Sequence, residues 1–433
     1  MSVMSRIVAA GQGLIDWVDE RFPLVSTWKY HMSEYYAPKN FNFWYYFGSL
    51  AMIVLVLQIV TGIFLTMNYK PDALTAFGSV EYIMRDVSGG WFIRYMHSTG
   101  ASMFFVVVYL HMMRALLYGS YRKPRELLWI FGCMIYLALM AEAFMGYLLP
   151  WGQMSYWGAQ VIVNLFSSVP FIGPDLSVWI RGDFLVSDAT LNRFFALHVI
   201  ALPLVLVGLV FLHLVALHEV GSNNPDGIEI KKNKDPVTGK PVDGIPFFPY
   251  YIVKDLIGIV VFFIVFFAIL FFGPEMGGYF LEYNNFLPAD PLQTPAHIAP
   301  VWYFTPFYAM LRAVPAMFGS QFAGVAVMGA GVIILFFLPW LDKSPVKSIR
   351  YKGPIFRTAL AIFVVSFLVL GYLGVATTDV WGKMPEILPI IGGVEVATIV
   401  SRLLTIAYFA FFLAMPWYSR IDKCKPEPER LTG

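Results

Sequence analysis

Eight long runs of hydrophobic residues, separated by polar or turn-rich segments, dominate the pattern of this 433-residue chain. A helix needs about 20 apolar residues to cross the hydrocarbon core of a bilayer. Runs of this length therefore predict membrane-spanning helices rather than strands or short buried helices. We expect an all-α integral membrane protein with eight spans, at 44–67, 94–118, 127–149, 193–217, 252–272, 322–341, 358–378 and 401–418.

The positive charges lie mostly in alternate connecting segments. The N-terminal segment, the second, fourth and sixth loops and the C-terminal tail each hold three or more Lys and Arg residues, whereas each of the other four loops holds one or two. By the positive-inside rule, both termini face the cytoplasm or its equivalent. The third loop (150–192) and the fifth (273–321) then face outward. Both are apolar and rich in aromatic residues, so we expect them to pack on the membrane surface.

Composition supports the membrane assignment and excludes other classes of protein. Hydrophobic residues make up 58% of the chain and charged residues 13%, against about 25% charged residues in an ordinary soluble domain. The net charge of +2 gives no reason to expect a nucleic-acid partner. The chain holds two cysteines, Cys133 and Cys424, which excludes a disulfide framework and a Cys-based zinc or iron–sulfur site.

Four histidines lie inside the second and fourth spans, where an ionisable side chain is costly and tends to face the bundle interior. His97 and His111 are 14 residues apart, about four helical turns, so both face one side of their helix. His198 and His213 are 15 residues apart, and a π-bulge or a distortion at Pro203 could absorb the extra residue. Because the two spans run in the same direction, we expect His97 level with His198 near the outer face, and His111 level with His213 near the inner face.

Two level pairs of histidines indicate two bis-imidazole metal centres, and haem iron accepts axial histidines inside a helix bundle. The competing explanation is that each histidine hydrogen-bonds a neighbouring helix, which does not account for pairing at two depths. Glycines give independent support. Gly48 and Gly62 in the first span, and Gly132 and Gly146 in the third, repeat the 14-residue spacing, and we expect them to make room for the haem edges.

Cations near the histidines are candidates to neutralise haem propionates. Arg94, Arg114 and Arg193 lie at helix ends close to the four histidines, although interfacial cations also extend to the membrane surface without any ligand. The chain then divides into five parts. They are an N-terminal segment with a surface helix at 7–22 (1–43), a haem-binding four-helix bundle (44–218), an inner loop (219–251), a four-span region with the fifth loop (252–418) and a tail (419–433).

At these residues the sequence resembles the cytochrome b family of the quinol–cytochrome c oxidoreductases, along nearly the whole chain. The resemblance is carried by 94–102 (RYMHSTGAS), 146–159 (GYLLPWGQMSYWGA), 191–198 (LNRFFALH), 218–227 (HEVGSNNPDG), 247–258 (FFPYYIVKDLIG) and 288–312 (PADPLQTPAHIAPVWYFTPFYAMLR). It implies that His97 and His198 ligate a low-potential haem and that His111 and His213 ligate a high-potential haem. The chain length and a Lys-rich insertion around 228–243 resemble bacterial members.

The resemblance also implies two quinone sites on opposite sides of the membrane. The outer quinol-oxidation site would use Phe144, Tyr147, Gly158, Pro300, Trp302 and Tyr303. The inner quinone-reduction site would use His218, Lys254 and Asp255, with Ser222 and Asn223 nearby. Reduction of a quinone needs proton donors, which a histidine and an aspartate supply. Without the family resemblance, Tyr147 and Tyr303 are equally typical of aromatic residues at a membrane interface. Asp255 is then equally typical of a carboxylate that pairs with Lys254.

One departure from the family pattern concerns the proton acceptor of the outer site. The usual motif is Pro-Glu-Trp-Tyr, whereas this chain has Val301 in place of the glutamate. Another group must then accept the protons that quinol releases. We expect Glu142 to do so, because an isolated carboxylate inside a span is costly and lies only five residues before Tyr147. A carboxyl group that is simply hydrogen-bonded between helices is the alternative, and Glu275 and Glu282 are rival acceptors.

The function that follows is quinol oxidation outside and quinone reduction inside, with electrons crossing between two b-type haems (a Q cycle) and adding to the proton gradient. A Rieske-type iron–sulfur protein and a c-type cytochrome are the expected partners, in a homodimeric complex of the bacterial inner membrane. Two other classes stay open. A proton-coupled transporter with a histidine relay would bind no haem. A structural haem-binding anchor would leave His218, Asp255 and the outer loops unexplained.

Overall fold

All eight predicted spans are helices in the computed structural model, which describes residues 3–386 and 392–432. Residues 1–2 and 433, the ends of the first and last predicted segments, lie outside the described residues. Within the described chain, the helices long and apolar enough to cross a membrane are Phe43–Thr66, Gly90–Tyr118, Glu126–Leu148, Asp188–Val220, Tyr250–Phe272, Phe322–Leu341, Pro354–Val375 and Val396–Leu413. The predicted fold class is therefore confirmed.

The predicted end of the eighth span is wrong by five residues. The helix α16 (Val396–Leu413) stops before Ala414, and a short helix, α17 (Met415–Ile421), follows it. Pro416 explains the break, because proline has no N–H to donate and its ring clashes with the carbonyl one turn earlier. The apolar run continues through this point, so hydropathy alone cannot register the stop.

The first four spans pack in two pairs. The helix α3 (Tyr46–Thr66) lies along α5 (Gly90–Tyr118), and α6 (Glu126–Leu148) lies along α10 (Leu202–Val220). The next helix, α11 (Tyr250–Phe272), covers α3 and α5. A second group packs around α12. Its helices are α12 (Thr305–Ala313), α13 (Phe322–Ile333), α14 (Leu338–Leu341), α15 (Pro354–Val375), α16 and α17.

The fourth span contains a π-helical turn at Leu197–Ala201, between α9 (Asp188–Ala196) and α10. This turn includes His198. A π-helical turn holds about one residue more than an α-helical turn, so it absorbs the 15-residue spacing between His198 and His213. Of the two alternatives, a π-bulge and a distortion at Pro203, the structure shows the π-bulge.

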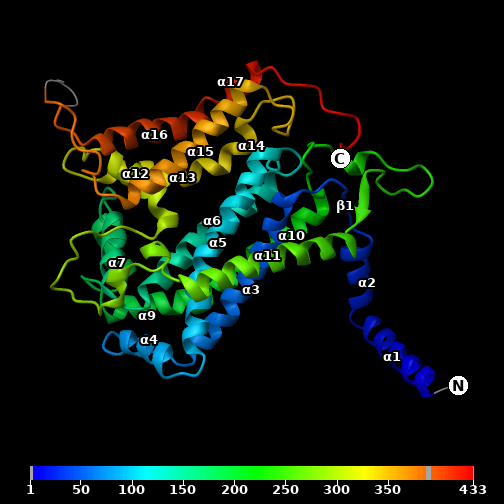
Figure 1. Cartoon of the computed structure of the whole chain (residues 1–433), viewed down its shortest axis with the longest axis horizontal. Coiled ribbons are helices and arrows are strands. Elements are labelled where there is room, and N and C mark those ends of the chain that lie inside the picture. Colours follow the sequence, from blue (N-terminus) through cyan, green and yellow to red (C-terminus); the bar gives the residue numbers. More distant parts are fainter. Residues whose placement is uncertain (1–2, 387–391, 433) are drawn as a thin grey trace.

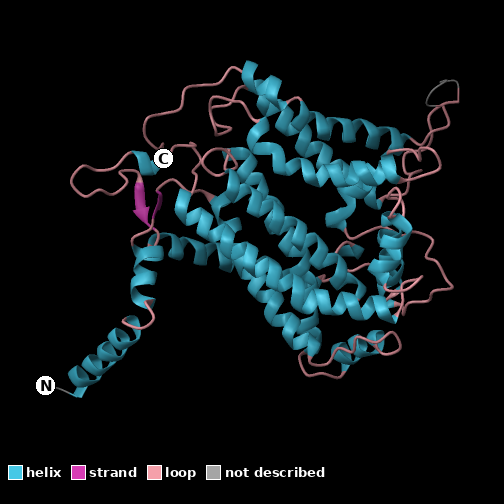
Figure 2. Ribbon diagram, turned by 180° about the vertical axis from the view of Figure 1, so that it is seen from behind, coloured by secondary structure: helices cyan, strands magenta, loops and turns pink. Residues whose placement is uncertain are grey.

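The connecting segments gather at the two ends of the helix bundle (Figure 1). One end, here called the outer end, holds α4 (Ala76–Arg85), α7 (Gln153–Phe166), α8 (Gly173–Arg181) and α9. The opposite, inner end holds the antiparallel strands β1 (Tyr36–Pro38) and β2 (Gly244–Pro246), which tie the N-terminal segment to the fourth loop with Tyr36 opposite Pro246. Figure 2 shows the same division from behind.

The N-terminal helices α1 (Val3–Asp19) and α2 (Leu24–Trp28) project away from the body (Figures 1 and 2). Neither has a buried residue. The helix predicted at 7–22 is thus present, although it ends at Asp19 and begins four residues earlier than predicted. That it lies along a membrane surface stays a prediction.

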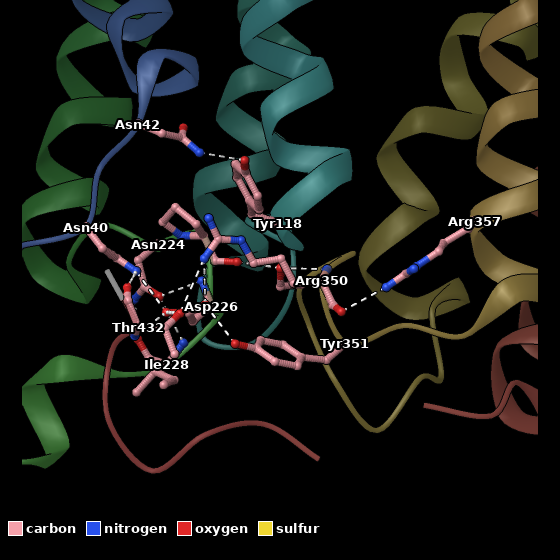
Figure 3. Close-up of polar contacts among 12 residues, drawn as sticks. Asn40, Asn42, Tyr118, Asn224, Asp226, Ile228, Arg350, Tyr351, Arg357 and Thr432 are labelled. Carbon is pink, nitrogen blue, oxygen red and sulfur yellow. Dashed lines mark hydrogen bonds and ion pairs between the residues drawn. The ribbon is translucent and has the colours of Figure 1, made fainter. Parts of the chain in front are cut away.

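A buried carboxylate joins four distant segments at the inner end (Figure 3). Asp226 of the fourth loop accepts hydrogen bonds from Arg350, Tyr351, Asn40 and Thr432. Burial disfavours the charged carboxylate, but the hydrogen bonds from Tyr351, Thr432 and Arg350 outweigh it and lower the pKa of Asp226. The N-terminal segment, the fourth and sixth loops and the tail are therefore held together.

Candidate functional site

The four intramembrane histidines form two facing pairs. The ring centres of His97 and His198 are 6.2 Å apart, with planes at 86°. Those of His111 and His213 are 6.4 Å apart, with planes at 56°. Two imidazoles that bind one metal from opposite sides, each through a nitrogen about 2 Å from the ion, place their ring centres about 6 Å apart. The predicted pairing is confirmed, and each pair has the separation of a bis-imidazole centre.

Hydrogen bonds determine which ring nitrogen of His97 and of His198 is free to bind a metal. His198 Nδ1 lies 2.9 Å from the backbone carbonyl of Glu142 and 3.0 Å from its carboxylate, and both partners can only accept. His97 Nδ1 lies 2.9 Å from Thr61 Oγ1, which itself donates to the Leu57 carbonyl. Each Nδ1 therefore carries the hydrogen and donates it. The Nε2 atoms are left as the free nitrogens, which is the usual arrangement around a metal-binding histidine.

The four glycines lie at the depths of the four histidines, but they face imidazole rings. A methyl group at each glycine would press on a ring of the neighbouring helix. The pairs are Gly48 with His111, Gly62 with His97, Gly132 with His213 and Gly146 with His198. At Gly62 the added carbon would sit 3.3 Å from the His97 ring and at Gly132 3.4 Å from the His213 ring. The glycines thus let the rings occupy the space between the helices, and the expected contact with a haem edge stays a prediction.

Two of the three predicted cations lie beside the histidine pairs. Arg94 borders the same cavity as His97 and His198. A guanidinium nitrogen of Arg114 is 3.3 Å from the His111 ring nitrogens, and its Nε is buried with no hydrogen-bond partner among the described residues. Arg193 is placed elsewhere. It is exposed and donates to the Trp179 carbonyl at 2.5 Å.

A cavity of about 490 Å³ opens between the outer histidine pair and the fifth loop. The predicted quinol-site residues Tyr147 and Tyr303 line it, together with Val301, Glu142 and Arg94. The Tyr303 ring stacks on Phe105 with centres 3.8 Å apart, which fixes this wall. The cavity is large enough for a small-molecule ligand and mostly apolar, as such sites are.

Four predicted quinol-site residues do not line this cavity. Trp302 donates its indole N–H to Ser102 Oγ at 3.2 Å, and Phe144 packs edge-on against Phe194. Gly158 on α7 has open space where a side chain would be, so no close backbone approach requires glycine there. Pro300 precedes Val301 and is half-buried.

A second cavity, of about 290 Å³, adjoins the first at the outer end and shares Arg94 and Asn285 with it. Glu282 lines this second cavity. Its Oε2 is buried with no hydrogen-bond partner among the described residues, and the side chain interacts electrostatically with Tyr147. Burial raises the pKa of Glu282. A buried carboxyl group with one oxygen free of partners among the described residues, near enough to Tyr147 to interact with it electrostatically, has the position of a proton acceptor.

The predicted inner-site residues lie in two groups. Asp255 accepts a hydrogen bond from Ser49 at 2.7 Å and forms no ion pair with Lys254, whose ammonium lies over the Tyr251 ring. In the other group, His218 Nδ1 lies 2.9 Å from the Leu214 carbonyl, which can only accept, so this nitrogen carries the hydrogen and donates it. Within 3–386 and 392–432, no hydrogen bond or ion pair joins His218 to Asp255.

The N-terminal segment completes the surroundings of His218. The ring of His31 lies 4.9 Å from the His218 ring and that of Tyr35 4.8 Å from it. The Tyr35 hydroxyl is 3.1 Å from Ser222 Oγ. The other predicted neighbour, Asn223, instead donates to the Tyr118 carbonyl at 2.7 Å. His31 and Tyr35 were not predicted, because no periodicity or motif connects the N-terminal segment with the fourth loop. Ser49 was not predicted either, because its contact with Asp255 depends on how α3 packs on α11.

Comparisons with known proteins agree along the chain. Residues 32–221 match the family model "Cytochrome b/b6/petB", and residues 288–409 match "Cytochrome b(C-terminal)/b6/petD". The chain is 66% identical to "Cytochrome b" of Allochromatium vinosum, over 97% of this chain and 98% of that protein. It is 50% identical to "Cytochrome b" of Rickettsia bellii, over 96% of each. A chain of a solved "Hyperthermophilic respiratory Complex III" superposes with a TM-score of 0.82 and 38% identity, covering 94% of this chain and 99% of that one.

Proposed function

Because the chain belongs to the cytochrome b family, we propose that it oxidises quinol near its outer end and reduces quinone near its inner end, with two bis-histidine haems between the sites. Membership makes it a haem-binding, multi-pass membrane protein and the catalytic core subunit of a quinol–cytochrome c oxidoreductase. The separate positions of the two sites and the ligation of the haems are the proposed part.

The observation that carries the proposal is the pair of ring separations, 6.2 and 6.4 Å, at two depths of the same helix pair. His97 and His198 would hold the outer haem, and His111 and His213 the inner one. When bound, the haems supply one-electron carriers that link the outer and inner quinone sites. Arg94 and Arg114 are placed to offset the negative charge of propionates. Arg193, with its guanidinium directed to Trp179, is left out of this role.

At the outer site, the chain binds quinol and takes up protons. Tyr147 and Tyr303 supply two of the polar groups in a mostly apolar wall, which suits an aromatic ligand with two hydroxyl groups. Trp302, Phe144, Pro300 and Gly158 would act behind this wall by shaping the loops. The bond of Trp302 to Ser102 is one such support.

We assign the acceptor of the quinol proton to Glu282 rather than to Glu142. Glu142 uses one carboxylate oxygen for His198, at 3.0 Å. Both carboxyl groups keep one buried oxygen without a partner among the described residues, but Glu282 also borders the second cavity and interacts electrostatically with Tyr147. It also lies on the fifth loop, near the outer surface, where a proton can be released to water. The expected consequence of removing it is described in the Discussion.

At the inner site, Asp255 and His218 would supply protons to quinone from opposite walls. They make no direct contact, so a quinone between them can receive a proton from each. Ser49 holds the Asp255 carboxylate in place. The Tyr35 ring packs against His218, and its hydroxyl bonds Ser222, so these two residues would hold the His218 ring in place. Lys254 would contribute positive charge. His31 extends this group toward the N-terminal segment.

Replacing Asp255 by asparagine should slow reoxidation of the inner haem by quinone, by roughly 10²-fold, because a positioned proton donor is lost. Quinol oxidation at the outer end should continue. The measurement is the kinetics of haem reduction and reoxidation in the complex, with quinol as the electron donor and no inhibitor added. Asp235→Asn, which changes a half-buried aspartate of the fourth loop, before α11 begins, is the control. Equal slowing at both sites would refute the assignment.

The complex and the membrane complete the proposal. Because the chain holds two cysteines, an iron–sulfur cluster and a covalent haem must belong to other subunits. A Rieske-type iron–sulfur protein and a c-type cytochrome are the fitting partners, in a homodimeric complex of the bacterial inner membrane with both chain termini cytoplasmic. The alternating distribution of Lys and Arg supports this orientation.

The function is tested by quinol–cytochrome c turnover in the purified complex together with a reduced-minus-oxidised haem spectrum. We expect turnover and two b-type haem signals. A chain without a haem spectrum would be a proton-coupled transporter, and a chain with haem but without turnover would be a structural anchor. Either result would overturn the proposal.

A further inference from the structure

The carboxylate of Glu142 contacts a proposed haem ligand directly. Its Oε1 lies 3.0 Å from His198 Nδ1, and both side chains are only 16% exposed. The backbone carbonyl of the same residue lies 2.9 Å from the same nitrogen. One residue of α6 therefore provides two acceptors for a single N–H of the fourth span. Such a pair restricts the rotation of the imidazole ring.

The other three histidines have no carboxylate at this position. His97 donates to the hydroxyl of Thr61, and His111 has the Arg114 guanidinium at 3.3 Å. His213 Nδ1 has no hydrogen-bond partner in the described part of the chain. Arg94 borders the outer cavity, but no hydrogen bond from it to either outer histidine is found among the described residues. The two pairs thus differ in the group that contacts a ligand directly, which is a carboxylate at His198 and a guanidinium at His111. Arg94 also acts electrostatically on His97.

The physical effect of a carboxylate behind a metal-binding imidazole is general. Accepting the Nδ1 hydrogen increases the electron density of the ring and makes it a stronger ligand for the oxidised metal. A hydrogen bond to an axial ligand is one of the few means by which a protein sets the reduction potential of a haem. The stronger ligation favours the oxidised form of the outer centre.

We propose that Glu142 is a positioning residue that lowers the reduction potential of the outer haem through its hydrogen bond from His198. The inner pair has no carboxylate at this position, so we expect the hydrogen bond to act on the outer centre alone. This inference rests on the proposed ligation of the outer haem by His198.

The test is a redox titration of both haems in the intact complex carrying Glu142→Gln. Glutamine keeps an oxygen that can accept the Nδ1 hydrogen but removes the carboxylate. The outer haem should become easier to reduce, with its reduction equilibrium shifted about tenfold, or about 59 mV for one electron. The inner haem should be unchanged. Glu126→Gln, at the other end of α6, is the matched control and should leave both potentials unchanged.

If Glu142→Gln keeps the outer haem and its reduction potential does not shift, the inference is overturned. The proposed ligation of the outer haem would stand in that case. If the variant loses the outer haem, Glu142→Asp decides the question. Retention of that haem at a near-native potential by the aspartate variant supports a role for the carboxylate. Loss of the haem in both variants shows a purely structural requirement and overturns it. Retention of the outer haem in His198→Ala would instead refute the ligation on which the inference depends.

Discussion

Replacing His97 or His198 by alanine should remove the outer haem and leave the inner one, so that the complex keeps half of its b-type haem. Replacing His111 or His213 should have the opposite result. The reason is geometric, because each ring faces one partner about 6 Å away across the helix pair, and a haem that loses one of two axial ligands in a dry bundle has no substitute nearby.

The measurement is haem content per polypeptide, combined with the reduced-minus-oxidised spectrum of the assembled complex. His297→Ala is the matched control, since His297 is exposed on the fifth loop and bonds the Val375 carbonyl. It should retain both haems. If the His97 and His111 variants lost the same haem, the assignment of level pairs would be wrong.

Replacing Glu282 by glutamine should reduce quinol oxidation by roughly 10²-fold, the usual contribution of a positioned general base. Both haem spectra should stay intact, because Glu282 lies on the fifth loop and touches neither histidine pair. Burial raises the pKa of Glu282. Below this pKa the group is protonated and cannot accept, so native activity should rise with pH through that range, and the glutamine variant should lose this rise.

The double variant Glu282→Gln with Val301→Glu makes the test sharper. It restores a carboxylate at the motif position that lines the larger cavity, so turnover should recover at least in part. Glu275→Gln, which changes the neighbouring carboxylate of the same loop, should have little effect. Normal turnover in Glu282→Gln, or collapse in Glu275→Gln alone, would show that another group accepts the proton.

Much of the fold was predictable because a bilayer leaves few alternatives. Backbone groups in hydrocarbon must bond internally, so a long apolar run has to be a helix. The π-helical turn at Leu197–Ala201 was predictable for a similar reason. Four α-helical turns hold about 14 residues. Two histidines 15 residues apart therefore face the same side only if the helix takes up one more residue between them, as the π-helical turn does. The end of the eighth span was missed because hydropathy does not register the backbone effect of Pro416.

The contacts of the site were harder to predict where they depend on tertiary packing. The contact of Glu142 with His198 had a partial signal, because Glu142 lies one turn before Gly146 on the same face of α6, and Gly146 was expected to face a haem. Arg193 lies five residues before His198, which turns its side chain well away from the histidine face. His31 and Tyr35 meet His218 only through the docking of the N-terminal segment, and no local pattern records that contact.

The central claim is that two separate haems connect an outer and an inner quinone site. It is tested most directly by an anaerobic redox titration of the haem absorption in the intact complex, with haem counted against polypeptide. The account predicts two b-type haems per chain that titrate in separate steps. A single haem per chain, or a loss of both haems when only His97 is replaced, would contradict it.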